Sequence, residues 1–90
     1  MNKNELIDTI ATQLNKSKQE TEAFLNTFID VVSNETAQGN KVQLTGFGTF
    51  DRRYKAPRTG RNPKTGESLL IPAKYLPVFK AGKAFKELCS

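Results

Sequence analysis

The chain has 90 residues, the length of about one domain. It carries 14 basic and 9 acidic residues, for a net charge of +5 and an isoelectric point near 9.6, and 37% of its residues are hydrophobic. It contains no histidine and one cysteine, Cys89, which excludes histidine-dependent nucleophiles, internal disulfides and cysteine- or histidine-based zinc sites. We therefore expect neither an enzyme nor a cofactor, metal or small-molecule substrate.

No apolar run approaches the length of a bilayer span, and the first residues lack the pattern of a secretory signal peptide. The sequence therefore predicts a cytoplasmic protein with no membrane partner.

The charge is distributed unevenly along the chain. Residues 1–51 carry four bases and seven acids, a net charge of −3, whereas residues 52–90 carry ten bases and two acids, a net charge of +8. This asymmetry indicates a polyanionic partner. The alternative is a basic surface that serves only solubility, but such surfaces usually intersperse acids among the bases.

Two helices are predicted in the first half of the chain. One apolar face recurs with helical spacing over residues 3–14, and Asn2 with Glu5 fits a cap at its start. Ser17 and Glu20 have the spacing of a capping box for a second, longer helix. Gly39 and the residue after it supply a left-handed stop for that helix.

From residue 42 the apolar period changes from 3.6 to 2, which is typical of strands. We expect strands at 42–45, from Phe50 onward, at 69–71 and at 75–79, with a glycine-flanked turn at 46–48. A short last helix is expected over residues 82–88.

The polar segment at about 52–74 is predicted to form a β-arm around the turn Pro63-Lys64-Thr65-Gly66. If Asn62 faces Glu67, the same register places Tyr54 opposite Tyr75 and Phe50 opposite Phe79, which are sensible aromatic pairs. It also places Pro57 opposite Pro72, where neither residue can donate to a ladder. We expect a loosely paired, mobile ribbon.

The second helix is apolar around much of its circumference, so it needs neighbours on two sides. In so short a chain a second copy can supply one of them, and a homodimer is predicted; the alternative is a monomeric α+β domain. The residues expected in the core or the dimer interface are apolar: Phe28, Ile29, Val32, Leu44, Phe47, Phe50 and Phe79.

The strings LTGFGTF (residues 44–50) and GRNPKTGE (residues 60–67) resemble the HU and integration-host-factor family of bacterial DNA-bending proteins, and the likeness covers all 90 residues. The resemblance implies an α+β fold with two N-terminal helices, a three-stranded antiparallel sheet, a long protruding β-arm and a short C-terminal helix, in an intertwined homodimer or a heterodimer with a paralogue. It implies one DNA-binding domain, with a helical dimerisation part at 1–40 and the sheet, arm and last helix at 41–90.

The resemblance also implies the function, which is bending and compaction of double-stranded DNA in the nucleoid through the minor groove, with little sequence specificity. The resemblance implies that Pro63 at the arm tip is an intercalating wedge, the kind of apolar side chain that minor-groove architectural proteins insert between base steps to kink the duplex. The other residues expected to contact DNA are polar or basic: Lys3, Lys18, Arg53, Lys55, Arg58, Arg61, Asn62, Lys64, Lys74, Lys80, Lys83 and Lys86.

Three alternatives remain open at this point. The segment at 57–60 is similar to an integration-host-factor arm, which would favour a sequence-selective subunit, although Thr45 stands where one such subunit carries arginine. A basic hairpin could also serve an RNA- or ribosome-associated protein, but residues 55–74 contain no aromatic side chain on which bases could stack. Finally, Pro63 could serve only to shape its turn.

Overall fold

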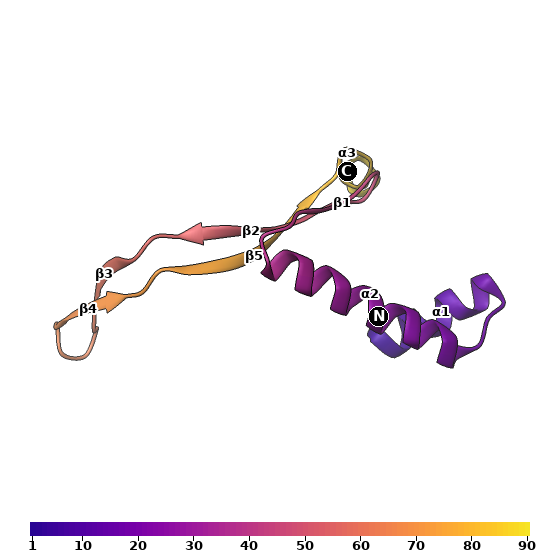
Figure 1. Cartoon of the computed structure of the whole chain (residues 1–90), viewed down its shortest axis with the longest axis horizontal. Helices are drawn as coiled ribbons and strands as arrows, with labels where there is room; N and C mark the ends of the chain where they lie inside the picture. The colour runs from indigo at the N-terminus through magenta and orange to yellow at the C-terminus, as the bar shows by residue number, and fades with distance from the viewer. The chain divides into compact units, whose positions relative to one another are not determined.

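The computed structural model describes residues 1–90 and contains three α-helices and five β-strands (Figure 1). In chain order these are α1 (Lys3–Leu14), α2 (Lys18–Ala37), β1 (Val42–Leu44), β2 (Gly48–Lys55), β3 (Arg58–Arg61), β4 (Ser68–Ile71), β5 (Lys74–Ala81) and α3 (Lys83–Cys89). The chain divides into two compact units, residues 1–34 and 35–90, so the boundary falls within α2. None of the helices is long and apolar enough to cross a membrane.

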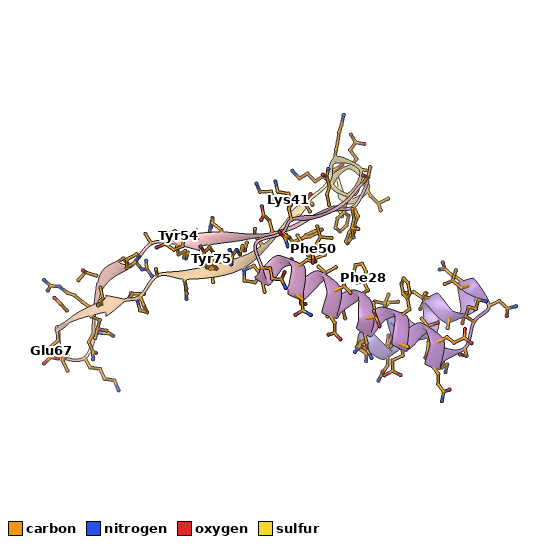
Figure 2. All side chains as sticks on the ribbon, in the orientation of Figure 1. Phe28, Lys41, Phe50, Tyr54, Glu67 and Tyr75 are labelled. Atoms are coloured by element: carbon orange, nitrogen blue, oxygen red, sulfur yellow. The ribbon has the colours of Figure 1, made fainter.

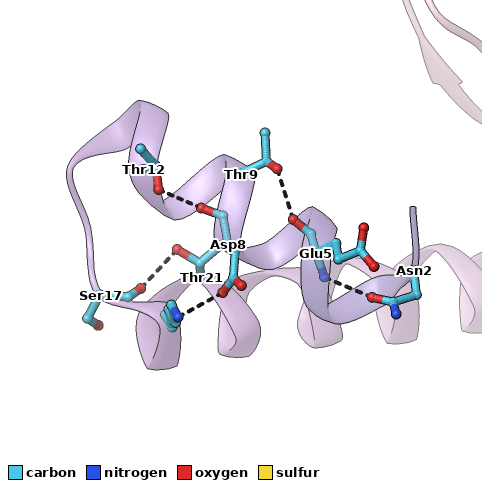
Figure 3. Close-up of polar contacts among 8 residues, drawn as sticks. Asn2, Glu5, Asp8, Thr9, Thr12, Ser17 and Thr21 are labelled. Atoms are coloured by element: carbon cyan, nitrogen blue, oxygen red, sulfur yellow. Dashed lines mark hydrogen bonds and ion pairs between the residues drawn. The ribbon is translucent and has the colours of Figure 1, made fainter.

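The first unit is a helical hairpin in which each helix has the predicted cap at its start, with the Ser17 half of the capping box formed at α2. The Asn2 side chain accepts a hydrogen bond from the Glu5 N–H at 2.9 Å (Figure 3). The Ser17 hydroxyl accepts one from the Glu20 N–H at 3.1 Å, at the start of α2. Each cap satisfies an N–H group that has no partner within the helix. Between the helices Asn15 adopts a left-handed conformation, with φ of 55°.

The contacts between α1 and α2 are small and partly polar. Ile7 and Ala11 are the buried residues of α1, and Thr21 is buried on α2, where its hydroxyl donates to the Ser17 carbonyl at 3.0 Å. Lys18 forms an ion pair with Asp8 at 3.2 Å (Figure 3). Such an exposed pair contributes little to stability, so this hairpin alone has a minimal core.

The predicted stop of α2 is confirmed. Gly39 has a φ of 88°, and its N–H donates to the Thr36 carbonyl at 3.0 Å. The Asn40 N–H donates to the Glu35 carbonyl at 2.9 Å, which completes a glycine-based helix end. This last turn of α2 belongs to the second unit.

The second unit contains a three-stranded antiparallel sheet in the order β1-β2-β5. A turn at residues 45–47 joins β1 to β2, with Gly46 at a φ of 86° and the Phe47 N–H donating to the Leu44 carbonyl at 2.9 Å. β2 begins at Gly48, two residues earlier than the sequence suggests, because the ladder to β1 and β5 starts directly after the turn.

The predicted register of the arm is confirmed. Phe50 pairs with Phe79 and Tyr54 with Tyr75 in the ladder between β2 and β5. Beyond an unpaired interruption that contains both Pro57 and Pro72, β3 and β4 resume pairing in the same register, down to Arg61 opposite Ser68. The arm is thus an extension of β2 and β5 that ends in a separate two-stranded ribbon (Figure 1).

The last helix, α3, runs one residue later than predicted at each end, since Gly82 caps it from outside. The Gly82 N–H donates to the Phe47 carbonyl at 2.8 Å. A Cβ at residue 82 would lie 3.2 Å from that same carbonyl oxygen, so glycine allows α3 to begin directly against the turn.

Four phenylalanines gather where the turn, the sheet and α3 meet. Phe47 stacks on Phe85 with ring centroids 5.1 Å apart, and Phe79 lies 5.2 Å from Phe47 and 4.9 Å from Phe50. Phe47 and Phe79 nevertheless remain 44% and 40% exposed. Across the whole chain only Ile7, Ala11 and Val32 are buried hydrophobic residues, and no side chain is fully buried. The single chain therefore lacks a closed core.

Gly48 is the position at which the sheet is least tolerant of a side chain. A Cβ there would lie 2.4 Å from the Phe79 ring and 2.6 Å from the Lys80 carbonyl oxygen. We expect Gly48→Ala to lower the free energy of unfolding by about 1–3 kcal/mol or more, because either the ring or the backbone must move. Thermal or denaturant unfolding measures the loss.

The matched control is Gly46→Asn. Gly46 is left-handed but has no atom near its missing Cβ, and asparagine tolerates that conformation. We expect a smaller loss than for Gly48→Ala. Equal stability of Gly48→Ala and the parent would contradict the packing described for Phe79.

Candidate nucleic-acid interface

The three-stranded sheet has two chemically different faces. Side chains alternate along each strand, and residues paired across a ladder share a face. Phe50, Arg52 and Tyr54 of β2 therefore share one face with Tyr75 and Phe79 of β5, and the ring contacts among them agree. We call this the aromatic face.

The opposite face, here called the basic face, carries the remaining charged residues of the sheet. Its members alternate with those of the aromatic face: Gln43, Thr49, Asp51, Arg53, Lys55, Lys74, Leu76, Val78 and Lys80. We add Lys41, which directly precedes β1, by continuing the alternation of that strand by one residue. Five of these are basic and one is acidic. This face accounts for four of the predicted DNA contacts, Arg53, Lys55, Lys74 and Lys80.

Two of these bases stand directly opposite each other. Lys55 pairs with Lys74 at the end of the ladder between β2 and β5, and both are exposed. Like charges in this arrangement destabilise a strand pair. A bound polyanion would remove that repulsion, whereas a sheet that binds no anion would retain it.

The bases of the second half of the chain are not neutralised internally. The structure contains one ion pair, between Lys18 and Asp8, and both residues lie in the first unit. The ten bases between residues 52 and 90 make no ion pair with an acid. Apart from Arg52, whose guanidinium contacts the Ala37 carbonyl and the Tyr75 ring, their charge is therefore available to an external partner.

The arm continues this basic surface to its tip. Arg58 and Arg61 are exposed on β3, and Pro63 and Lys64 are exposed in the loop that follows. Figure 2 shows Glu67 at the same end of the arm. One continuous strand register thus connects the predicted DNA contacts of the sheet with those of the arm. The apolar ring of Pro63 lies at the far end of the arm.

The arm tip has a defined conformation. The Asn62 N–H donates to the Glu67 carbonyl at 2.9 Å, and the Gly66 N–H donates to the Asn62 carbonyl at 2.8 Å. The Asn62 side-chain oxygen accepts from the Lys64 N–H at 2.9 Å, which holds Pro63 inside a small side-chain-closed turn. Asn62 was predicted to contact DNA, but in the structure its side-chain oxygen accepts a hydrogen bond within the arm tip.

The remaining predicted contacts lie elsewhere. Lys83 and Lys86 are exposed on α3, in the second unit. Lys3 and Lys18 belong to the first unit, where the Lys3 ammonium donates to the Asn26 side-chain oxygen and Lys18 pairs with Asp8. Both are exposed, but unlike the predicted contacts on the sheet and the arm they already have side-chain partners.

Sequence reasoning overlooked Lys41, which precedes β1 and falls on the basic face. It lies outside the dense basic run. Its position two residues before Gln43, with apolar Val42 between them, could have indicated that Lys41 and Gln43 share the polar face of a strand. Figure 2 shows it on the sheet part of the chain. Conversely Arg52, which opens the basic run, lies on the aromatic face.

The residues predicted for the core or dimer interface are only partly covered. Val32 is buried; Phe28, Leu44 and Phe50 are intermediate. Ile29 is 44% exposed, and the wide apolar stripe of α2 extends to Phe24, which is 72% exposed. The apolar surface expected to be covered is thus present and open.

Comparison with known proteins identifies this arrangement. The family model described as "Bacterial DNA-binding protein" matches residues 1–90. The chain belongs to this family. Among its relatives, the DNA-binding protein HU-beta 2 of Neisseria meningitidis is 51% identical over 87 residues, covering 97% of this chain and 96% of the relative. The DNA-binding protein HU of Lactococcus lactis is 49% identical over 86 residues, covering 96% of this chain and 94% of the relative.

Solved structures agree over the whole chain. The cocrystal structure of Anabaena HU with DNA is 41% identical and superposes with a TM-score of 0.94, covering 100% of this chain and 98% of that one. HU of Thermotoga maritima is 31% identical with a TM-score of 0.71, and each chain is fully covered. The α+β fold with its arm is therefore the fold of HU proteins.

Proposed function

We propose that the protein is an HU-type architectural DNA-binding protein, which binds double-stranded DNA through the minor groove with little sequence specificity and bends it. The observation that carries this proposal is the full-length match to Anabaena HU cocrystallised with DNA, with a proline at the tip of a basic arm. The acid-poor basic face and the uncompensated arm charges give the physical reason. Arginine and lysine neutralise phosphates, and that contact is sequence-independent.

The alternatives have less support. A sequence-selective subunit needs side chains that read base edges, but the exposed polar groups here are mostly cations suited to phosphate. An RNA-associated protein would want exposed aromatic platforms, and the arm beyond Tyr54 and Tyr75 has none. The relatives are named as DNA-binding proteins, which favours an architectural protein of the nucleoid over an enzyme.

Within this function each group of site residues has a role. Pro63 is the wedge that partly unstacks a base step, and Arg58, Arg61 and Lys64 bind along the minor groove. The basic face, with Lys41 added, holds the phosphates of the duplex between the arms. Lys83 and Lys86, with Lys3 and Lys18, extend this contact along the flank, and Asn62 supports Pro63 by closing its turn.

The working unit of this function is a dimer. Large apolar side chains are open to solvent in the single chain: Phe24 on α2 is 72% exposed, and Phe47 and Phe79 are 44% and 40% exposed. A second copy that covers them would form an interface, and a stable interface covers roughly 800 Å² or more on each partner.

We expect unfolding to depend on protein concentration, because dissociation and unfolding are linked when the core is shared between copies. The thermal midpoint should rise over a hundredfold increase in concentration, and sedimentation should give the mass of two chains. A fixed midpoint together with a monomer mass would exclude the dimer.

We expect Pro63→Ala to reduce DNA bending while leaving the fold unchanged, because the tip is exposed and the charges of the arm remain. Binding to linear duplex should weaken modestly. Binding to nicked duplex should weaken more, by about tenfold, since a site that bends easily gains most from the wedge. Fluorescence energy transfer between the duplex ends and competition between nicked and intact duplex measure the two effects.

The control is Pro57→Ala, the same substitution at the interruption of the ladder rather than at the tip. It should preserve the preference for nicked duplex. If Pro63→Ala bends DNA as the parent does and retains that preference, Pro63 serves only to form its turn.

A further inference from the structure

Arg52 is a cation in the basic run whose guanidinium already contacts two other groups of the protein. One of its terminal nitrogens, Nη1, donates to the Ala37 carbonyl at 3.0 Å. The guanidinium carbon lies 3.8 Å from the centroid of the Tyr75 ring. The side chain is half-buried, and it comes from β2 on the aromatic face. It therefore joins three segments of the second unit, namely the end of α2, β2 and β5.

The contact with Ala37 uses the chemistry of a helix end. Ala37 is the last residue of α2, and carbonyls of the last turn have no partner within the helix. They also carry the negative end of the helix dipole, which favours a cation. Arg52 meets both needs, and α2 has no basic residue in its own last turn that could do so.

Gly39 provides the space for this arrangement. A Cβ at residue 39 would lie 2.8 Å from the second terminal nitrogen of Arg52 and 3.2 Å from its guanidinium carbon. Gly39 also has a φ of 88°, which ends the helix. The end of α2 and the space for the Arg52 guanidinium therefore depend on the same glycine. The guanidinium is thus held between the helix end and the Tyr75 ring.

The aromatic side of the contact leads to the base of the arm. Tyr75 lies against Tyr54, with ring centroids 5.3 Å apart, and the two residues pair across β2 and β5 (Figure 2). One pair further on, at Lys55 and Lys74, the ladder ends. The Arg52 contact therefore stabilises the last ordered pairs before the interruption at 56–57 and 72–73.

We infer that Arg52 is a positioning residue that fixes the base of the arm against the end of α2, and that its charge is not used on DNA phosphate. The inference about bending rests on the proposed function. The four-pair ribbon of β3 and β4 is too short to be rigid alone. The direction in which it reaches DNA is therefore set by the strand pairs that Arg52 stabilises.

The chain offers a matched control in the next residue. Arg53 has the same charge and lies on the same strand, but it is exposed on the basic face. Arg52→Gln and Arg53→Gln each remove one positive charge per copy. They differ in which face of the sheet loses it.

The first measurement uses the free dimer and requires no DNA. Nitrogen-15 relaxation gives backbone order parameters for residues 53–56 and 73–76. In Arg52→Gln we expect these values to fall from about 0.85, typical of rigid backbone, toward about 0.6, while Arg53→Gln keeps the parent values. Unchanged order parameters in Arg52→Gln would overturn the inference, whatever happens with DNA.

The second measurement uses duplex DNA and the dependence of affinity on salt. Loss of one phosphate contact reduces the magnitude of the log–log slope by about 0.9, so the loss of one contact per copy reduces it by about 1.8 in the dimer. We expect that decrease for Arg53→Gln, and an unchanged slope for Arg52→Gln together with a broader distribution of end-to-end distances in the bent duplex. A slope loss equal to that of Arg53→Gln would show that Arg52 binds phosphate and would overturn the inference.

Two further variants keep the test decisive if Arg52→Gln does not fold. Tyr75→Leu removes the ring under the guanidinium but leaves the charge, and Arg52→Lys keeps the charge but loses the planar stack. Each variant should lower the backbone order parameters at the arm base without changing the salt dependence of DNA binding. If both variants keep the order parameters of the parent protein, Arg52 does not position the arm. If the parent itself fails to bend DNA, the proposed function fails, whereas the order parameters of the free protein still decide the role of Arg52.

Discussion

The apolar surface that a single copy cannot bury is the constraint on which the rest of the structure depends. A chain of this length folds into two helices, a small sheet and a short last helix, yet three buried hydrophobic residues are all that it achieves alone. The Phe47, Phe79 and α2 surfaces must be covered for the fold to persist. We expect a second copy to cover them, so the aromatic face of the sheet is committed to protein.

That commitment leaves the other face of the sheet free, and we propose that DNA binds there. Strand alternation places Lys41, Arg53, Lys55, Lys74 and Lys80 together without any need for a specialised loop. The same alternation continues into the arm. There the core gives the strands no packing support, and two prolines, Pro57 and Pro72, interrupt the strand pairing. Stability and binding are thus divided between the two faces of one sheet, and the arm obtains its reach at the expense of rigidity.

Much of this could be predicted from local patterns. The caps at Asn2 and Ser17, the stop at Gly39 and the register of the arm follow from signals within a few residues, or from a turn that fixes which residues pair. What could not be predicted depends on contacts between distant segments. The sequence placed Arg52 in the dense basic run without giving it a role, and only the fold shows its guanidinium on Ala37 and Tyr75.

The start of β2 at Gly48 is a similar case, because a glycine carries no alternation signal. Its place in the strand is set by the Phe79 ring that occupies the space of its missing side chain. Lys41 was overlooked for a different reason. It is isolated in sequence from the other bases, and it comes near their face only because β1, which it directly precedes, pairs with β2.

The division of the sheet into a protein-binding and a DNA-binding face is tested most directly by lysine reactivity. Acylation rates of individual lysines, measured by mass spectrometry with and without saturating duplex DNA, report which face the DNA covers. The account predicts that Lys41, Lys55, Lys74 and Lys80 all become slower to react in the complex. If the complex is saturated and these four lysines react as fast as in the free protein, DNA does not lie on the basic face and the account is wrong.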